Sequence, residues 1–145
     1  MKKLVSVVVI GSVLVLVAAA VQAQLPGTPI RASIPFDFMV RGKMLPAGNY
    51  EVSRINDDPI GLMIRNLDQK HDTVMFETEP VYMRKTPGKN MLVFNRYGDT
   101  YFLSEIKTAS ENTAREAYPS RAERHLQQQT VMNHVEPQTV TVVCD

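Results

Sequence analysis

The sequence predicts an all-β protein: a small antiparallel β-sandwich or partly open barrel of six or seven strands, with one short C-terminal helix near residues 120–129. Two observations lead to this prediction. Apolar and polar residues alternate in several runs that short polar loops separate, which is the pattern of half-buried strands. The alternation stops near residue 109, and helix-forming residues behind a capping signal follow it.

The first 23 residues have the pattern of a secretory signal peptide. Lys2 and Lys3 precede an apolar run over residues 4–20, and the sequence VQA then ends at Ala23. A basic start, an apolar centre and small residues before the cleavage point define such a signal. We therefore expect residues 1–23 to be removed and the mature protein to be periplasmic or secreted. The alternative is an uncleaved membrane anchor, because the apolar run approaches the length that spans a bilayer.

A linker is expected over residues 24–29, QLPGTP, and a β-domain over residues 30–109. The first run of the β-domain alternates cleanly and places four apolar side chains on one face: Ile34, Phe36, Phe38 and Val40. Residues 46–48, Pro-Ala-Gly, separate this run from the next one. Because proline fixes φ and glycine permits conformations closed to other residues, we expect this stretch to bend the chain at a corner of the sandwich.

Further runs predict strands at residues 62–67, 73–83, 91–97 and 101–108. Pro80 interrupts the second of these runs, and since proline cannot donate a ladder hydrogen bond, it predicts an edge position or a bulge. The Pro-Gly loop at residues 84–90 predicts a hairpin, and the turn at residues 97–100 predicts another. The run at 91–97 is apolar on both faces, which predicts a central strand covered on both sides. The predicted core comprises Ile34, Phe36, Phe38, Tyr50, Val52, Ile64, Phe76, Val93, Phe94, Phe102 and Leu103.

Residues 110–130 are expected to form a polar connector and a short helix packed on the β-domain. Ser120 and Glu123 have the spacing of a capping box, in which each side chain bonds the backbone amide of the other residue. Residues 131–145 are expected to form a tail, whose run TVTVV at 139–143 has strong strand tendency. This run would either close the sheet within its own chain or add to a sheet edge in another copy.

Composition excludes some classes of function. The chain has a formal net charge of only +1, with signs interspersed, so it offers no basic field for nucleic acid. Cys144 is the single cysteine, which excludes an intramolecular disulfide. In an oxidising compartment it is a candidate for an intermolecular disulfide, the alternative being an unpaired thiol in a frayed tail. We expect a monomer or a weak homodimer, with the membrane involved only through the uncleaved signal peptide.

Few residues have the spacing of a chemical site. Glu77 and Glu79 would share one face of a strand at a separation compatible with an inverting glycosidase pair, but alternating carboxylates on a solvent face are far commoner. The three histidines, His71, His125 and His134, share no spacing that would converge on a metal. No nucleotide-binding or nucleophile motif is present. We expect no catalytic residue, no metal and no cofactor.

A candidate interaction patch combines charged and aromatic side chains. Arginines lie in and before the expected helix at Arg115, Arg121 and Arg124, where they could bind carboxylates of a partner. Tyr97 and Tyr101 flank the turn of the second hairpin and could stack on a sugar or another ligand. The alternatives are a solvated helix face for the arginines and core packing for the tyrosines.

Three stretches together resemble a known group: IPFDFMVRGKMLPAGNYEV, MLVFNRYGDTYFLSEI and AREAYPSRAER. They are similar to a widespread group of short, uncharacterised exported bacterial proteins that carry a signal peptide, over about residues 30–126. The group usually has glycine where Ala114 stands and leucine where Ala117 stands. The resemblance implies export but brings no activity, ligand or site residue. The pattern LPAG-x-Y-x-V is also similar to β-sandwich modules of envelope and carbohydrate-associated proteins, which bears on fold more than on function.

The functional expectation is a non-enzymatic cell-envelope or secreted protein, a structural or interaction module with an unidentified envelope or extracellular partner. A binding module for a small apolar or sugar ligand is the alternative. A hydrolase that uses Glu77 and Glu79 is a less favoured one.

Overall fold

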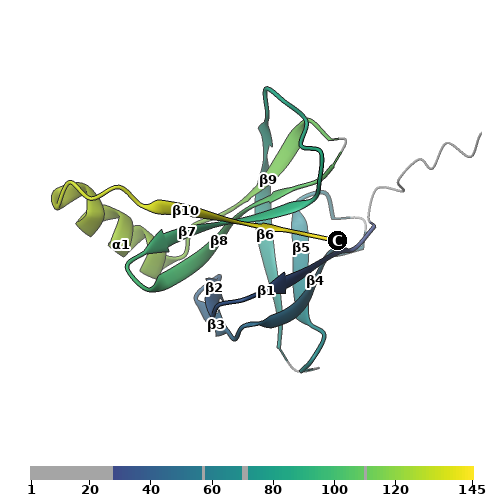
Figure 1. The fold of residues 1–145 in the computed structure, drawn as a ribbon, viewed down its shortest axis with the longest axis horizontal. Coiled ribbons are helices and arrows are strands. Elements are labelled where there is room, and N and C mark those ends of the chain that lie inside the picture. Colours follow the sequence, from purple (N-terminus) through teal and green to yellow (C-terminus); the bar gives the residue numbers. More distant parts are fainter. Residues whose placement is uncertain (1–27, 57, 70–71, 110) are drawn as a thin grey trace, which may run out of the picture.

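The structure, a computed structural model, describes residues 28–56, 58–69, 72–109 and 111–145. The expected signal peptide at residues 1–23, residues 24–27 of the expected linker, and His71 lie outside the described residues. The elements in chain order are β1 (Ile30–Ile34), β2 (Phe38–Val40), β3 (Lys43–Leu45), β4 (Gly48–Arg54), β5 (Gly61–Asn66), β6 (Thr73–Tyr82), β7 (Met91–Tyr97), β8 (Thr100–Lys107), β9 (Thr113–Ala117), α1 (Arg121–Met132) and β10 (Gln138–Val143) (Figure 1). The predicted all-β class with a C-terminal helix is confirmed, with ten strands rather than six or seven among the described residues. No helix in the described part of the chain is long and apolar enough to cross a membrane.

The long strand β6 joins two halves of one sheet. Its first half, residues 73–77, pairs with β5, and β5, β4 and β1 follow in antiparallel order. Its second half, residues 78–82, pairs with β9, and the sheet continues through β8 and β7 to β10. The two halves face each other across the core, as the ribbon shows (Figure 1).

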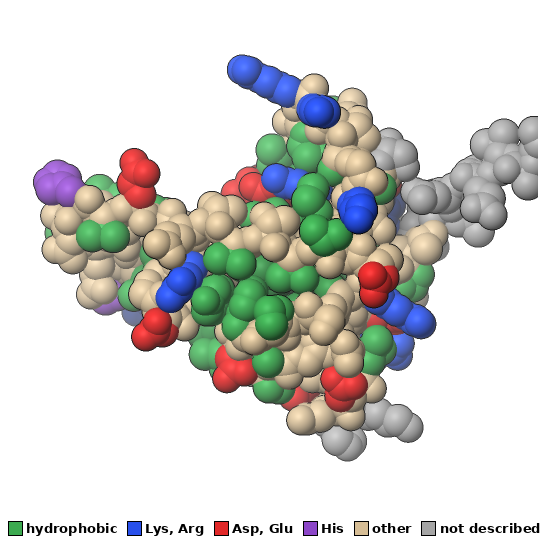
Figure 2. Space-filling view, in the orientation of Figure 1, with side chains coloured by type: hydrophobic (Ala, Val, Ile, Leu, Met, Phe, Trp, Pro, Cys, Tyr) green, Lys and Arg blue, Asp and Glu red, His purple; other side chains and the backbone are tan. Residues whose placement is uncertain are grey.

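The sheet remains open at its ends, so the fold is a partly open barrel. The hairpin of β2 and β3 attaches to β8 through a single parallel pair, Met39 with Phe102. The end of the chain reaches the opposite half, where the Asp145 amide donates to the Arg31 carbonyl at 3.0 Å. Figure 2 shows hydrophobic side chains gathered on the face that β10 crosses, between β10 and the strands β1 to β3.

The chain changes from one half to the other at the predicted Pro-Ala-Gly corner. The Asp37 carboxylate accepts the Ala47 amide at 2.8 Å, and the Tyr50 hydroxyl donates to the Pro46 carbonyl at 2.6 Å. The Asn66 side-chain amide in turn donates to the Tyr50 oxygen at 3.0 Å. Both Tyr50 and Asn66 are buried, so this network fixes the corner from inside the core. The stretch LPAGNY therefore fixes the corner between the two halves of the sheet.

The core confirms most of the predicted residues. All members of the predicted core are buried except Phe36, which is only partly buried because it lies in the bend between β1 and β2. There it stacks on Tyr101, with ring centroids 4.0 Å apart, and meets Phe94 edge-on. Buried apolar residues that were not predicted include Leu45, Leu62, Val74, Leu92, Ile106 and Cys144.

Two expectations about the second half of the sheet were wrong. The connector at residues 110–130 contains a strand, β9, which inserts between β6 and β8. The loop at residues 84–90 therefore joins two strands that do not pair, and it is not a hairpin loop. Both errors have one physical cause. The charged sequence TAREA has no apolar alternation of its own, and it forms a strand because it pairs with β6 and β8.

Other local predictions are confirmed. Pro80 pairs with β9 on one side, and β5 has already ended on its other side, so it occupies an edge position as expected. The strand β7 lies between β8 and β10 with Leu92, Val93 and Phe94 all buried. The run at residues 139–143 lies in β10 within its own chain, where Val140 and Val142 are partly buried and face the core.

Candidate functional site

A groove lies at the seam where the two halves of the sheet separate. Past Ala117 the chain leaves β6 and turns into α1, so no described strand continues beside the first half of β6. The groove has a volume of about 1040 Å³ and lies between the β2–β3 turn, the middle of β6, the start of β8 and the first two turns of α1.

The floor of the groove is the apolar core itself. Phe76 comes from β6, Phe102 and Leu103 from β8, and Val40 from β2, and each of the four is at least nine-tenths buried. These residues are held in place by the strand alternation that built the core, so the floor is rigid. It offers apolar contact and no ionisable group.

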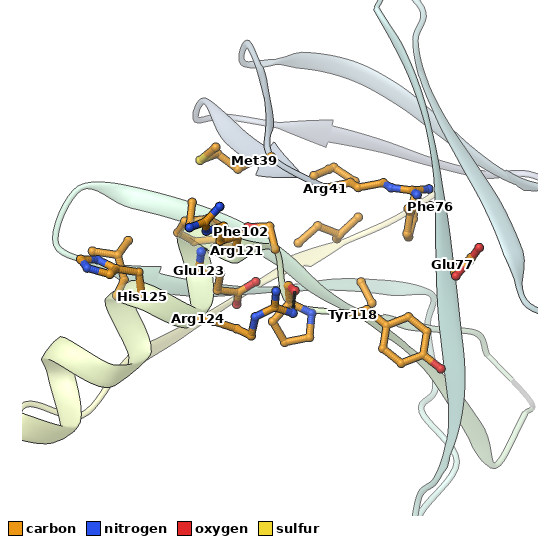
Figure 3. Close-up of a pocket in the computed structure, with 18 residues that line it drawn as sticks. Met39, Arg41, Phe76, Glu77, Phe102, Tyr118, Arg121, Glu123, Arg124 and His125 are labelled. Carbon is orange, nitrogen blue, oxygen red and sulfur yellow. Dashed lines mark hydrogen bonds between the residues drawn. The ribbon is translucent and has the colours of Figure 1, made fainter.

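Three arginines stand around this floor. Arg41 lies in the β2–β3 turn, and Arg121 and Arg124 lie in the first turns of α1; all three are exposed. Figure 3 shows Arg121 and His125 toward one end of the groove and Glu77 toward the other. In the described part of the chain, no carboxylate forms an ion pair with any of the three arginines. Arg124 donates one N–H to the Pro119 carbonyl at 3.1 Å, and its other donors, with those of Arg41 and Arg121, are available to an anionic group in the groove.

Arg41 occupies a backbone conformation that does not favour arginine. Arg41 and Gly42 are the central residues of a two-residue hairpin turn, with φ of 50° and 81°. A turn with positive φ at both positions favours Asn, Asp or Gly at the first, and other side chains incur a cost of about 1–2 kcal/mol there. Residues held in such conformations cluster at functional sites. Arg41 was not among the candidate site residues predicted from the sequence; the charged residue before the turn glycine was the available signal.

The start of α1 is capped by its own residues. The Ser120 hydroxyl accepts the Glu123 amide at 3.2 Å, and the Glu123 carboxylate accepts hydrogen bonds from the Ser120 backbone and from Asn95 Nδ2, the latter at 3.2 Å. This confirms the predicted capping box. Burial raises the pKa of Glu123, and the hydrogen bonds from Asn95 and Ser120 oppose that effect. The Glu123 carboxylate already accepts a hydrogen bond from the backbone at the start of α1. An anion in the groove would therefore be attracted by the arginine side chains and not by the start of the helix.

The predicted interaction patch is not brought together as one surface. Arg121 and Arg124 border the groove, whereas Arg115 borders a different, small hollow near Ile106 and Glu111. Tyr97 is buried edge-on against Phe102. Its side chain also hydrogen-bonds Gln127 of α1, and burial raises the pKa of its hydroxyl.

Tyr101 lies on the other face of the β7–β8 hairpin from Tyr97. It stacks on Phe36, and the Arg96 guanidinium lies 5.3 Å from its ring centroid. The two tyrosines thus form no common stacking surface, and each packs within the fold.

Cys144 lies in the core. Its side chain is 7% exposed, and burial raises the pKa of its thiol to about 11. The intermolecular disulfide stays a prediction, and it would require the end of the chain to leave the core.

The outer face of the second half of the sheet carries a row of carboxylates. Glu79 on β6, Glu116 on β9 and Glu105 on β8 are directly opposite one another. Burial raises the pKa of Glu116, and the charges of Glu105 and Glu79 raise it further. Of the pair suggested for a hydrolase, Glu77 borders the groove and Glu79 belongs to this row. Among the described residues, no group of three His, Cys, Asp or Glu side chains is arranged to hold a metal ion.

Comparisons with known proteins found no match. The chain matches no protein-family model, and no curated protein or solved structure matches it.

Proposed function

We propose that the mature protein is an exported, non-enzymatic interaction module of the cell envelope or the secreted fraction, and that the groove is its binding surface. Export is supported by the sequence of residues 1–23 and by the resemblance to exported bacterial proteins.

The observation that carries the binding proposal is the combination of an apolar floor with an arginine rim. A volume of about 1040 Å³ lies just above the usual size of ligand sites, roughly 300–1,000 Å³. Binding sites typically combine such an apolar lining with a few polar groups that orient the ligand. The floor is supplied by Phe76, Phe102 and Leu103, and the rim by Arg41, Arg121 and Arg124.

A groove-filling variant tests this proposal. Ala122 is exposed and lines the groove, whereas Gln128 is exposed on the same helix and does not. The mature protein, Ala122→Trp and the matched control Gln128→Trp are screened by thermal shift against envelope sugars, fatty acids, alkyl phosphates and short peptides. A ligand that binds only the folded state raises the melting temperature by mass action.

We expect at least one class of ligand to raise the melting temperature of the wild type and of Gln128→Trp, and to leave Ala122→Trp unchanged. Equal shifts in all three proteins would place binding outside the groove. No shift with any class would contradict the binding proposal.

A further inference from the structure

We propose that the groove receives an extended acidic segment of a partner protein, which adds as a strand to the free edge of β6. This inference rests on the proposed function and names the chemistry of its partner.

The first observation is an open strand edge. The Thr78 amide donates to the Ile60 carbonyl on the β5 side at 2.9 Å. Because successive residues of a strand direct their amides to opposite edges, the amides and carbonyls of Met75 and Glu77 face away from β5. The strand β9 covers that edge of β6 only over residues 78–82, and no described strand pairs with it over residues 73–77.

This edge borders the groove. Phe76 and Glu77 line it on β6, and Ala117 and Tyr118 line it where β9 ends. A segment placed there would continue the position of β9 along β6. Added strands of this kind gain affinity from main-chain hydrogen bonds and specificity from alternate side chains.

The second observation is charge complementarity. Arg121 and Arg124 on one wall and Arg41 on the other have no ion-pair partner in the described part of the chain. Arginine forks bind carboxylates in bidentate geometry, which selects acidic side chains in the added strand. Glu77 lies away from Arg121 at the other end of the groove (Figure 3), so the acidic residues that Arg121 and Arg124 would bind belong at the α1 end.

The third observation favours a peptide over a lipid. An alternating segment would direct one set of side chains toward Phe76, Phe102 and Leu103 and leave its backbone free to bond Met75 and Glu77. An acyl chain has no hydrogen-bonding groups along its length and would leave that edge unpaired.

Peptide selection and calorimetry test the inference. Short random peptides are selected by display on the mature protein, and the best binder is synthesised in three forms: unchanged, with Lys in place of each acidic residue, and with alternate backbone nitrogens methylated. A soluble alkyl phosphate serves as the lipid probe. Affinities are measured by titration calorimetry for the wild type, Arg41→Ala, Arg121→Ala, Ala122→Trp and Gln128→Trp.

We expect selected peptides to alternate acidic with apolar residues. The Lys form and the backbone-methylated form should each bind at least about tenfold more weakly than the parent, a loss of about 1.4 kcal/mol. Each arginine variant should weaken binding of the parent peptide by roughly three- to tenfold, which is the size of an ordinary net hydrogen bond. Binding should be lost in Ala122→Trp and kept in Gln128→Trp.

Two results would overturn the inference and leave the proposed function standing: equal affinity for the Lys or methylated form, or groove binding of the alkyl phosphate without any selected peptide. If neither a peptide nor the alkyl phosphate binds, the inference is overturned. If, in addition, no ligand in the thermal-shift screen raises the melting temperature, the proposed function is contradicted as well.

Discussion

Arg41 occupies a backbone conformation that costs stability, and under the proposed function its side chain contributes to binding. Its positive φ suits asparagine or glycine, yet the position carries a long cation on the wall of the groove. The alternation of the sequence predicts strand structure up to Val40, before Arg41, but the groove wall depends on where the two halves of the sheet separate. That separation is non-local and could not be predicted from this stretch.

We predict that Arg41→Asn stabilises the protein and weakens binding. Asparagine tolerates the left-handed conformation, so the free energy of unfolding should rise by roughly 0.5–1 kcal/mol. Chemical denaturation measures that change, and titration with the selected peptide should show severalfold weaker binding. The idea fails if stability falls, or if stability rises and affinity is unchanged.

Tyr50 illustrates a residue whose hydroxyl serves the fold. It links the Pro46 carbonyl to the Asn66 amide inside the core. We predict that Tyr50→Phe lowers the free energy of unfolding by about 1–3 kcal/mol, because it leaves buried polar groups without a partner. Tyr82→Phe is the matched control, since Tyr82 is 82% exposed and should change little. Equal effects in urea denaturation would show that the Tyr50 network contributes nothing.

At the scale of strands, one row of charged side chains across the sheet alternates in sign, and another row consists of carboxylates. Across β1, β4 and β5, Glu51 accepts from Arg31 at 3.1 Å and from Arg65 at 2.7 Å, and all three are in register. Across β6, β9 and β8 the corresponding row consists of Glu79, Glu116 and Glu105, of which Glu105 also forms an ion pair with Lys107 at 2.9 Å. Like charges directly opposite one another destabilise a sheet.

We predict that Glu116→Gln stabilises the protein at neutral pH by about 0.2–1 kcal/mol, the usual size of such a pair. The raised pKa of Glu116 means that the folded state binds its proton more readily than the unfolded state does. Its contribution to stability is therefore present at low pH and is lost as pH rises through the folded pKa. The advantage of the variant should disappear in acid.

Denaturation at several pH values measures this effect. Glu136→Gln, an exposed carboxylate outside the sheet, is the control and should show no such pH dependence. A destabilised Glu116→Gln at neutral pH would contradict the assignment of repulsion to this row.

Local patterns in the sequence predicted β5, β6, β7, β8 and the capped helix. The prediction of one strand over residues 34–40 was wrong, because a bend at residues 35–37 separates β1 from β2, which pair with different halves of the sheet. Ile34, Phe38 and Tyr50 were predicted as core residues because they lie at alternate positions on the apolar face of their runs. The strand β9 was missed because TAREA lacks alternation, and its pairing partners lie far away in sequence. Of the candidate site, Arg121 and Arg124 were found from charge density alone. The groove forms because β9 pairs with only the second half of β6. No local sequence pattern indicates where that pairing ends, so the groove could not be predicted.

At the scale of the whole molecule, β10 covers part of the hydrophobic core of the partly open barrel. Val140 and Val142 pack on the core from β10, and Cys144 lies buried just beyond it. We predict that the native thiol reacts slowly with a disulfide reagent at mildly alkaline pH, because it is buried and its pKa is raised to about 11. The unfolded protein should react at the rate of a free cysteine. Rapid native labelling, or a covalent dimer without reductant, would show that the end of the chain leaves the core.

The proposed strand addition requires an open edge on β6. Amide hydrogen exchange of Met75 and Glu77 detects that edge when it is followed by NMR in the free protein and in the presence of the selected peptide. Both amides should exchange rapidly in the free protein and become protected at saturation, whereas the Thr78 amide, already bonded to Ile60, should be protected in both states. Protection of Met75 and Glu77 in the free protein, or rapid exchange that the bound peptide leaves unchanged, would contradict the proposed strand addition.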